Sequence, residues 1–186
     1  MAQEGDIIQS IAAGKKEAFS TLYQMYADKV YNTALSYSKN VEDAEEITQD
    51  VFVKIFKNAA VFKGESSLNT WIYRITVNTS LNYLKKKNRF SLFKNKLATG
   101  ESVEFVHPGV LLENKEKAAA LFKAMDGLPE TQKTAFILSY IEDLPRKEVA
   151  DIMEVTLKAV ESLLQRAKKN MRVKLENIHS KRRKSK

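Results

Sequence analysis

The sequence contains no cysteine, only two histidines, and few residues that interrupt helices, with six glycines and three prolines among 186 residues. Without cysteine, the chain can form neither disulfide bonds nor thiolate metal sites. His107 and His179 are far apart in the chain and neither lies in a cluster of metal-ligating residues, so we expect no bound metal. The shortage of glycine and proline is typical of a helical protein.

No apolar run is long enough to cross a bilayer. The N-terminal residues MAQEGDIIQS lack the basic and apolar segments of a secretory signal. The chain carries a net charge of +8 and has an isoelectric point near 9.5. This excess favours an anionic partner such as nucleic acid. We therefore expect a cytoplasmic protein that does not insert into the membrane, with room for one domain or two small ones.

Residues 62–89 combine a glycine-containing loop with a long helical pattern. Gly64 predicts a break in the chain, and Ser66 and Ser67 are candidate N-caps for the helix that follows. At about 100° per residue, the large apolar side chains gather on one side of this helix. They are Ile72, Tyr73, Val77, Tyr83 and Leu84, and the side chains opposite are Trp71, Arg74, Asn78, Asn82 and Lys85.

The polar side of this helix has two interpretations. Arginine, asparagine and lysine can hydrogen-bond base edges or phosphates, and tryptophan has a face on which a base can stack. Taken alone, however, a polar helix face is more often only solvated surface, and a tryptophan near a loop is often half-buried. The nucleic-acid interpretation therefore depends on the rest of the chain.

Residues 41–57 predict a helix with an acidic side. Its apolar side holds Ala44, Ile47, Val51 and Ile55, while Glu42, Asp43, Glu46 and Asp50 lie together elsewhere. Acids near a helix N-terminus favour the helix dipole, which accounts for the first two but less well for Asp50. An acidic face repels DNA and suits a basic protein surface. With no histidine, cysteine or glycine-rich loop nearby, we give acid–base or metal chemistry little weight.

The remaining segments are helices separated by breaks. We expect helices over 5–13 and 16–37, ended by Gly14 and Asn40, then a mixed segment over 90–113 that we interpret as a linker between two domains. The linker is apolar enough to lie in a groove on a partner. Residues 178–186, IHSKRRKSK, predict a disordered basic end that adds non-specific attraction to phosphates or only improves solubility.

Residues 145–175 predict two helices joined by a short turn. Pro145 opens the first, Glu154 and Val155 form the turn, and Thr156 is a good N-cap for the second. An apolar stripe runs along the second helix through Val160, Leu164, Ala167, Met171 and Leu175. Basic and polar side chains lie elsewhere on it, namely Lys158, Ser162, Gln165, Arg166, Lys169 and Arg172. This is the helix-turn-helix pattern, although helical hairpins without a DNA function share it.

Taken in order, these features resemble a bacterial RNA polymerase sigma factor of the extracytoplasmic-function (ECF) group of the sigma-70 family. Three motifs carry the resemblance, which covers residues 19–175. They are DAEEITQDVFVKIF at 43–56, FKGESSLNTWIYRITVNTSLNYLKKK at 62–87, and LPETQKTAFILSYIEDLPRKEVADIMEVTLKAVESLLQRAKKNMR at 128–172. The first two motifs are specific, particularly TWIYRI, whereas many helix-turn-helix proteins share the third.

The resemblance implies an all-α protein of two small helical domains with no catalytic residues or cofactor. Residues 1–90 would be sigma domain 2, which binds core RNA polymerase and the promoter's −10 element. Residues 91–113 would be the linker, 114–178 sigma domain 4, whose helix-turn-helix reads the −35 element, and 179–186 a basic tail. Many members of this family are held inactive by an anti-sigma factor, which makes such a protein a third expected partner beside polymerase and promoter DNA.

The resemblance also assigns residues to each partner. Core polymerase would contact Asp43, Glu46, Gln49 and Asp50. For the −10 element, Lys63, Gly64 and Ser66 would help capture a flipped-out base, and Trp71, Arg74, Asn78 and Asn82 would contact the strand, with Lys85, Lys86, Lys87 and Arg89 on phosphates. The −35 element would contact Lys158, Ser162, Gln165, Arg166 and Lys169.

The chain departs from the family pattern in the helix-turn-helix. Glycine is common where Glu154 stands, and lysine and arginine are common where Glu161 and Leu163 stand. Glu161 would repel phosphate unless Lys168 offsets its charge or a cytosine amine donates to it. Two other functions stay open at this point, a stand-alone helix-turn-helix regulator and an enzyme acting on nucleic acid. Against the enzyme stands the lack of a metal cluster, a nucleophile–base pair or a phosphate-cradling glycine loop.

Overall fold

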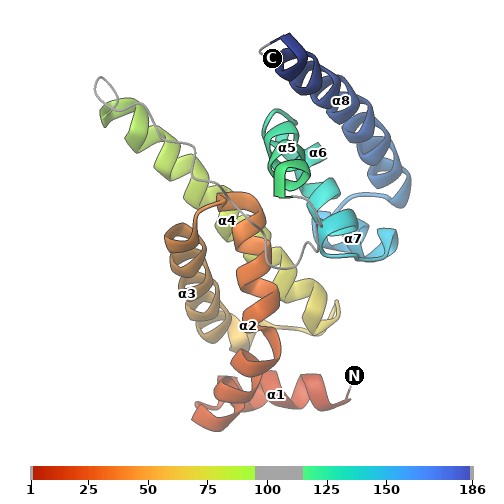
Figure 1. Ribbon diagram of the computed structural model, residues 1–186. Coiled ribbons are helices and arrows are strands. Elements are labelled where there is room, and N and C mark those ends of the chain that lie inside the picture. Colours follow the sequence, from red (N-terminus) through yellow and green to blue (C-terminus); the bar gives the residue numbers. More distant parts are fainter. Residues whose placement is uncertain (1, 95–114, 185–186) are drawn as a thin grey trace. The chain divides into compact units, whose positions relative to one another are not determined.

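The computed structural model describes residues 2–94 and 115–184, which fall into two compact units (Figure 1). Regular structure within these ranges is helical, and no strand occurs in them. The first unit contains α1 to α4 and the second α5 to α8. The prediction of an all-α protein with two helical domains is confirmed.

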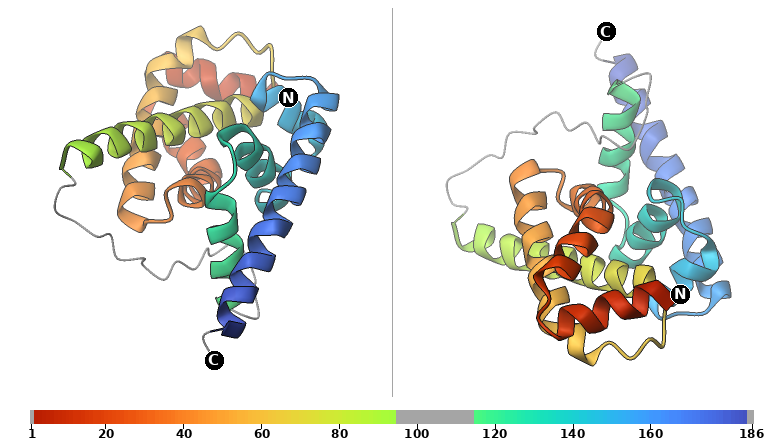
Figure 2. Two further views of the ribbon diagram at one scale, coloured as in Figure 1. Left: turned by 90° about the horizontal axis from the view of Figure 1, so that it is seen from above. Right: turned by 90° about the horizontal axis from the view of Figure 1, so that it is seen from below.

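The first unit is a bundle in which α2, α3 and α4 pack against one another (Figures 1 and 2). Its elements are α1 (Ala2–Ala12), α2 (Lys16–Ser38), α3 (Val41–Asn58), the short 3-10 helix η1 (Ala59–Val61) and α4 (Leu68–Lys94). Leu22, Val30, Ile47, Ile55 and Ile72 are each no more than 2% exposed and form the core. Each such side chain stabilises the bundle by about 1.5–3 kcal/mol through removal of apolar surface from water. The helix α1 covers α2 and η1.

Two polar side chains define where α3 and α4 begin. Asn40 was predicted to end α2, but Lys39 ends it in a left-handed conformation with φ of 56°. Asn40 instead begins α3, because its side-chain oxygen accepts a hydrogen bond from the Asp43 N–H at 2.8 Å. Of the two candidate caps for α4, Ser67 is the one that accepts from the Thr70 N–H, at 3.0 Å. Both arrangements satisfy donors that a helix N-terminus leaves unpaired.

The inner face of α4 is richer in hydroxyl groups than its apolar pattern predicts. Ile72, Tyr73 and Val77 are buried as expected, and Tyr83 and Leu84 are half-buried. Four small polar residues share the buried face, namely Thr70, Thr76, Thr79 and Ser80. The Thr76 and Ser80 hydroxyls each donate to a carbonyl one turn earlier at 2.8 Å, so they are satisfied on their own helix. The helix also continues to Lys94, four residues into the segment predicted as linker.

The second unit packs three shorter helices against α8 (Figure 2). It contains α5 (Lys115–Asp126), α6 (Glu130–Phe136), the π-helical turn η2 (Ile137–Ile141), α7 (Arg146–Met153) and α8 (Leu157–Lys184). Along α8 the predicted stripe is buried at Val160, Leu164, Ala167 and Met171. The predicted disordered end is wrong up to Lys184, because α8 continues through that residue.

The turn between α7 and α8 holds Glu154 in an unfavourable backbone conformation. Its φ is 55° and its ψ is 42°, and its N–H reaches the carbonyls of Ala150 and Asp151. Thr156 caps α8 as predicted, since its hydroxyl accepts from the Ala159 N–H at 3.2 Å. A residue with a Cβ is strained in this left-handed region, whereas glycine is not. The tight turn therefore forms at some cost to stability.

We predict that Glu154→Gly is more stable than Glu154→Ala by about 1 kcal/mol, because both changes remove the side chain but only glycine relieves the left-handed strain. Urea unfolding of the full chain, followed by circular dichroism, measures the difference in free energy of unfolding. Equal stability of the two variants would contradict this account of the turn.

Candidate protein and nucleic-acid interfaces

The predicted nucleic-acid side of α4 lies on the surface of the first unit. Asn78, Asn82 and Lys85 are exposed, while Trp71 and Arg74 are half-buried. The indole of Trp71 lies against the ring of Phe62, with centroids 4.9 Å apart and planes tilted by 45°. The indole is therefore partly covered by the chain's own loop, yet it is not enclosed in the bundle.

The loop before α4 is tied to this surface through Phe62, which contacts Trp71 from the start of the loop. Lys63 and Gly64 are exposed and Ser66 is half-buried. Gly64 has a φ of 72°, which a residue with a side chain rarely adopts, so the shape of the loop depends on glycine at this position. The loop and the first turn of α4 are therefore accessible to solvent. They present the Lys63 ammonium group, Gly64, the Ser66 hydroxyl and part of the Trp71 indole.

The basic residues near the end of α4 do not all behave alike. Lys85, Lys86 and Arg89 are exposed. Lys87 instead forms an ion pair with Asp43 of α3. The sequence prediction placed Lys87 with the phosphate contacts, but in the structure its ammonium group already has a carboxylate partner.

The predicted polymerase contacts on α3 also divide into two groups. Glu46, Gln49 and Asp50 are exposed, whereas Asp43 is only 8% exposed. One oxygen of Asp43 accepts from the Tyr83 hydroxyl at 2.9 Å, and the other pairs with Lys87. The prediction that Asp43 belongs to an outward acidic face is therefore wrong, since its carboxylate is directed to α4.

Tyr83 connects the two groups of acids. Its hydroxyl lies 2.9 Å from an Asp43 oxygen and 2.7 Å from an oxygen of Glu46, and it has a single proton to donate. Burial, together with the hydrogen bonds to Glu46 and Asp43, raises the pKa of Tyr83 well above its ordinary value. The hydroxyl therefore keeps its proton at neutral pH and shares this one proton between the two carboxylates.

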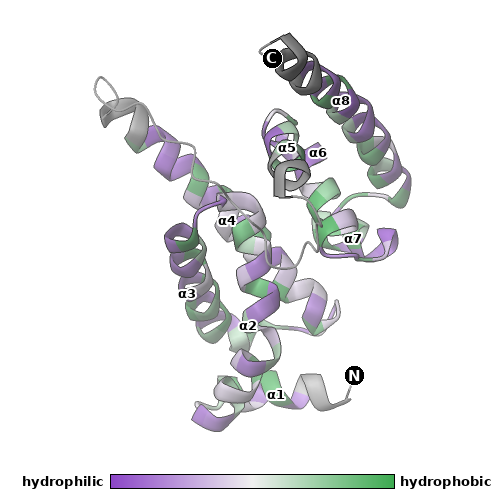
Figure 3. Ribbon diagram, viewed as in Figure 1, coloured by the Kyte–Doolittle hydropathy of each residue, from purple (hydrophilic) through white to green (hydrophobic). Residues whose placement is uncertain are grey.

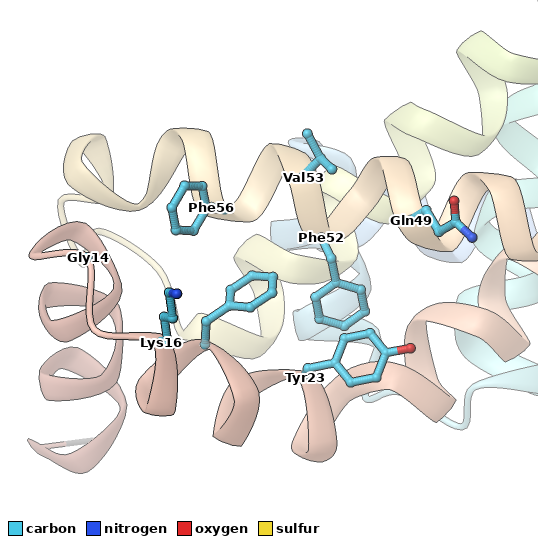
Figure 4. A pocket seen from close by; sticks show the side chains of 8 residues that line it. Gly14, Lys16, Tyr23, Gln49, Phe52, Val53 and Phe56 are labelled. Atoms are coloured by element: carbon cyan, nitrogen blue, oxygen red, sulfur yellow. The ribbon is translucent and has the colours of Figure 1, made fainter.

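An apolar groove lies between α2 and α3, and the sequence reasoning did not identify it (Figure 4). Its lining comes from both helices and from the turn before α2, and consists of Gly14, Lys16, Phe19, Tyr23, Gln49, Phe52, Val53 and Phe56. Phe19 contacts the rings of Phe52 and Phe56 edge-on, with centroids 6.2 and 5.7 Å away. Tyr23, Val53 and Phe56 are about half exposed, at 47%, 49% and 53%.

The groove and the exposed polar residues of α3 form one surface. At about 100° per residue, Glu46, Gln49, Asp50, Val53 and Phe56 fall on the same side of α3. We call these five residues the outer face of α3. Figure 3 shows the alternation of hydrophilic and hydrophobic residues along this helix. An apolar centre with a polar and acidic rim is the composition expected of a protein-binding surface. The signal in the sequence was the aromatic pair Phe52 and Phe56, which the buried stripe of the helix does not require.

In the second unit, α8 presents its predicted recognition residues on the surface. Lys158, Gln165, Arg166 and Lys169 are exposed and Ser162 is half-buried. The Arg166 guanidinium donates to the Ser162 hydroxyl at 3.0 Å, which orders the arginine on the helix surface. At about 100° per residue, Lys158, Arg166 and Lys169 lie along one side of α8.

Glu161 is neutralised in a way that the sequence did not indicate. Its carboxylate lies 3.8 Å from the Arg146 guanidinium of α7, and both side chains are about half exposed. Lys168, the expected partner, lies over the ring of Tyr140 at 4.9 Å from its centroid instead. The negative charge of Glu161 is thus offset by Arg146, in the first helix of the helix-turn-helix.

Residues 2–94 and 115–184 contain neither a metal-site cluster nor a membrane-spanning helix. No cluster of three or more histidine and carboxylate residues there has the arrangement of a metal site. None of the helices described is long and apolar enough to span a membrane.

Comparison with protein families assigns both units. Residues 22–90 match the model for sigma-70 region 2, and residues 118–171 match the model for sigma-70 region 4. The first match contains α3, the loop after it and α4 as far as residue 90, and the second contains α7, the turn and α8 as far as residue 171. The arrangement is that of a sigma-70-type transcription protein.

Individual relatives show to which group of sigma-70 proteins the chain belongs. The chain is 32% identical over 183 residues to the ECF RNA polymerase sigma-E factor of Haemophilus influenzae, covering 92% of this chain and 95% of the relative. It is 26% identical over 179 residues to the ECF RNA polymerase sigma factor SigW of Bacillus subtilis, covering 92% and 96%. The chain belongs to the ECF group of RNA polymerase sigma factors, and its function is that of a promoter-specificity subunit rather than a stand-alone regulator.

Solved structures agree on the fold. CnrH, solved in complex with the cytosolic domain of CnrY, matches with a TM-score of 0.69 at 19% identity, over 94% of this chain and 97% of CnrH. The sigma factor RpoE of Bartonella quintana, solved with the anti-sigma factor NepR, matches with a TM-score of 0.67 at 20% identity, over 85% of this chain and 96% of RpoE.

Proposed function

We propose that the outer face of α3 binds core RNA polymerase. The observation that supports this proposal best is the continuity of Glu46, Gln49 and Asp50 with an apolar groove on the same helix face. An apolar centre supplies the burial that a stable complex needs, and the acidic rim selects and orients a basic partner. Asp43, which the sequence assigned to the same contact, is buried against α4 and is not included.

The surface formed by the loop and the outer side of α4 binds the −10 element as single-stranded DNA. Lys63, Gly64 and Ser66 surround a captured base, Trp71, Arg74, Asn78 and Asn82 contact the strand, and Lys85 and Lys86 hold phosphates. The exposure of Asn78, Asn82 and the lysines supports this role. Unstacking a base costs a few kcal/mol, which stacking and phosphate contacts can offset. Duplex opening then needs no catalytic step by this chain.

The helix α8 reads the −35 element in the major groove through Lys158, Ser162, Gln165, Arg166 and Lys169. Their alignment along one side of α8 and the Arg166–Ser162 hydrogen bond support this assignment. The Arg146–Glu161 pair reduces the repulsion that Glu161 would exert on phosphate. An arginine that donates to guanine is the most common specific contact of such helices.

An anti-sigma factor is the third proposed partner. RpoE, which shares this fold, was solved bound to one. The exposed apolar groove of α2 and α3 is a surface that such an inhibitor can cover, and covering it would exclude polymerase. With promoter DNA and polymerase as partners, the chain acts in the cytoplasm and has no enzymatic activity of its own.

We predict that the purified chain, added to core polymerase, produces transcripts from defined start sites in a library of genomic fragments. Core polymerase alone should give no such transcripts. Sequencing the transcripts also reveals the promoter elements. No specific start sites in the presence of both components would contradict the assignment.

Asp50→Lys should weaken binding to core polymerase by about tenfold or more, because it reverses a charge at the rim of the proposed interface. Asp28→Lys is the matched control, since Asp28 is an exposed carboxylate on α2 away from the groove. Affinity is measured by fluorescence anisotropy with labelled sigma factor, and the fold is checked by circular dichroism. An equal loss in both variants would show that net charge, rather than contact at Asp50, governs binding.

Arg166→Ala should reduce −35-dependent promoter binding by about 1–3 kcal/mol and relax specificity at one base pair. The control is Arg172→Ala, further along α8, where the guanidinium pairs with Glu176 at 3.1 Å. Binding of the holoenzyme is measured on a promoter identified in the transcription experiment, with each −35 base pair varied in turn. A uniform loss over all sequences would mean that Arg166 contacts only phosphate.

A further inference from the structure

The basic end of α4 contains one lysine that faces away from the others. At about 100° per residue, Lys87 continues the buried side of the helix, in line with Ser80 and Tyr83. Lys85 and Arg89 fall on the opposite side, with the exposed Asn78. The helix therefore directs the Lys87 side chain toward α3, while Lys86 and Arg89 are exposed to solvent.

The partner of Lys87 is held in place more firmly than Lys87 itself. The side chain of Asp43 is 11% exposed, whereas that of Lys87 is 52% exposed. Asp43 lies in the first turn of α3, where its N–H donates to the Asn40 cap and a carboxylate is favoured by the helix dipole. The Tyr83 hydroxyl, which keeps its proton at neutral pH, donates to the second oxygen. In this pair the Asp43 carboxylate is held by its neighbours, whereas the Lys87 ammonium group is on a half-exposed side chain.

We propose that Asp43 is a positioning residue that withholds Lys87 from DNA phosphates in the free protein, rather than a contact for polymerase. The proposal rests on the DNA-binding role of the α4 surface given above. While Asp43 holds Lys87, α4 offers the exposed Lys86 and Arg89 to a DNA strand but withholds Lys87. The free chain therefore binds DNA more weakly than its sequence charge indicates.

The proposal predicts a gain of DNA binding on removal of a carboxylate. For single-stranded DNA, each added phosphate contact steepens the slope of log K against log salt by about 0.7, which at 0.1 M salt is about a fivefold gain in affinity. Asp43→Asn keeps the shape of the side chain and an oxygen for Tyr83, but releases Lys87. It should show that gain and steeper slope, with the affinity for core polymerase retained.

The test is a salt titration of the full chain with a fluorescein-labelled, mixed-sequence single-stranded oligonucleotide, followed by anisotropy. Glu45→Gln is the matched control, because it removes one negative charge from an exposed position of α3 that has no contact with Lys87. It should change affinity by less than about twofold, as a general charge effect. The double variant Asp43→Asn/Lys87→Gln should lose the gain. Thermal unfolding of each variant verifies the fold.

Lys87→Gln and Lys86→Gln make the proposal falsifiable even if Asp43→Asn unfolds the bundle. Lys87→Gln alone should leave the salt slope unchanged, while Lys86→Gln should lower it by about 0.7. An equal decrease in both would show that Lys87 already contacts phosphate, and would overturn the proposal. So would a loss of polymerase affinity in Asp43→Asn as large as that in Asp50→Asn. No change with Lys86→Gln would instead contradict the proposed DNA surface itself.

Discussion

The packing of α3 against α4 is the constraint on which both proposed surfaces of the first unit depend. The Ile47, Ile55 and Ile72 side chains bury the apolar faces of these helices, and small hydroxyl residues share the buried face of α4. The Lys54 ammonium group donates to the Thr79 hydroxyl at 3.0 Å across the same interface. With the inner faces fixed in this way, the outer face of α3 and the polar side of α4 are presented in a set geometry to different partners.

This packing also separates charge within a small bundle. The carboxylates of α3 and the cations of α4 are attracted to each other, and α3 must nevertheless keep an acidic surface while α4 keeps a basic one. The Asp43–Lys87 pair and the Tyr83 hydroxyl occupy the border between the two. Partial neutralisation at the border leaves Glu46 and Asp50 on one side and Lys85 and Lys86 on the other. Because solvent reaches the half-exposed Lys87 side chain, the pair contributes only about 0–1 kcal/mol to stability, and its main effect is on which charges are paired.

Much of the fold could be predicted from the sequence because apolar periodicity is strong where a helix buries one side only. The stripes of α3 and α8, and the capping role of Thr156, follow from residue type and spacing. The inner face of α4 was harder to predict, because threonine and serine carry no apolar signal until their hydroxyls are satisfied by their own helix. The capping role of Asn40 does not follow from its residue type, because asparagine favours both the end of one helix and the start of the next.

The candidate sites were predictable to the extent that they depend on one helix at a time. Asn78, Asn82 and Lys158 are exposed, as the helical pattern of each element indicates. Contacts between helices were not predictable from the pattern of one helix. Asp43 and Lys87 are 44 positions apart, and only the packing of α3 on α4 joins them. The same holds for Arg146 with Glu161, and for the groove of Phe19 with Phe52 and Phe56.

Contacts between helices explain how the fold tolerates residues that differ from the common family pattern. Glu161 places a negative charge on α8, the helix proposed to enter the major groove. Arg146 of the neighbouring helix α7 offsets this charge. Because the pair is exposed, it can separate when a phosphate or a base approaches. Arg146 could then contact a DNA phosphate, and Glu161 would be free to accept a hydrogen bond from a cytosine amine. On the proposed recognition helix, a carboxylate in this position would then favour cytosine, whose amine can donate to it.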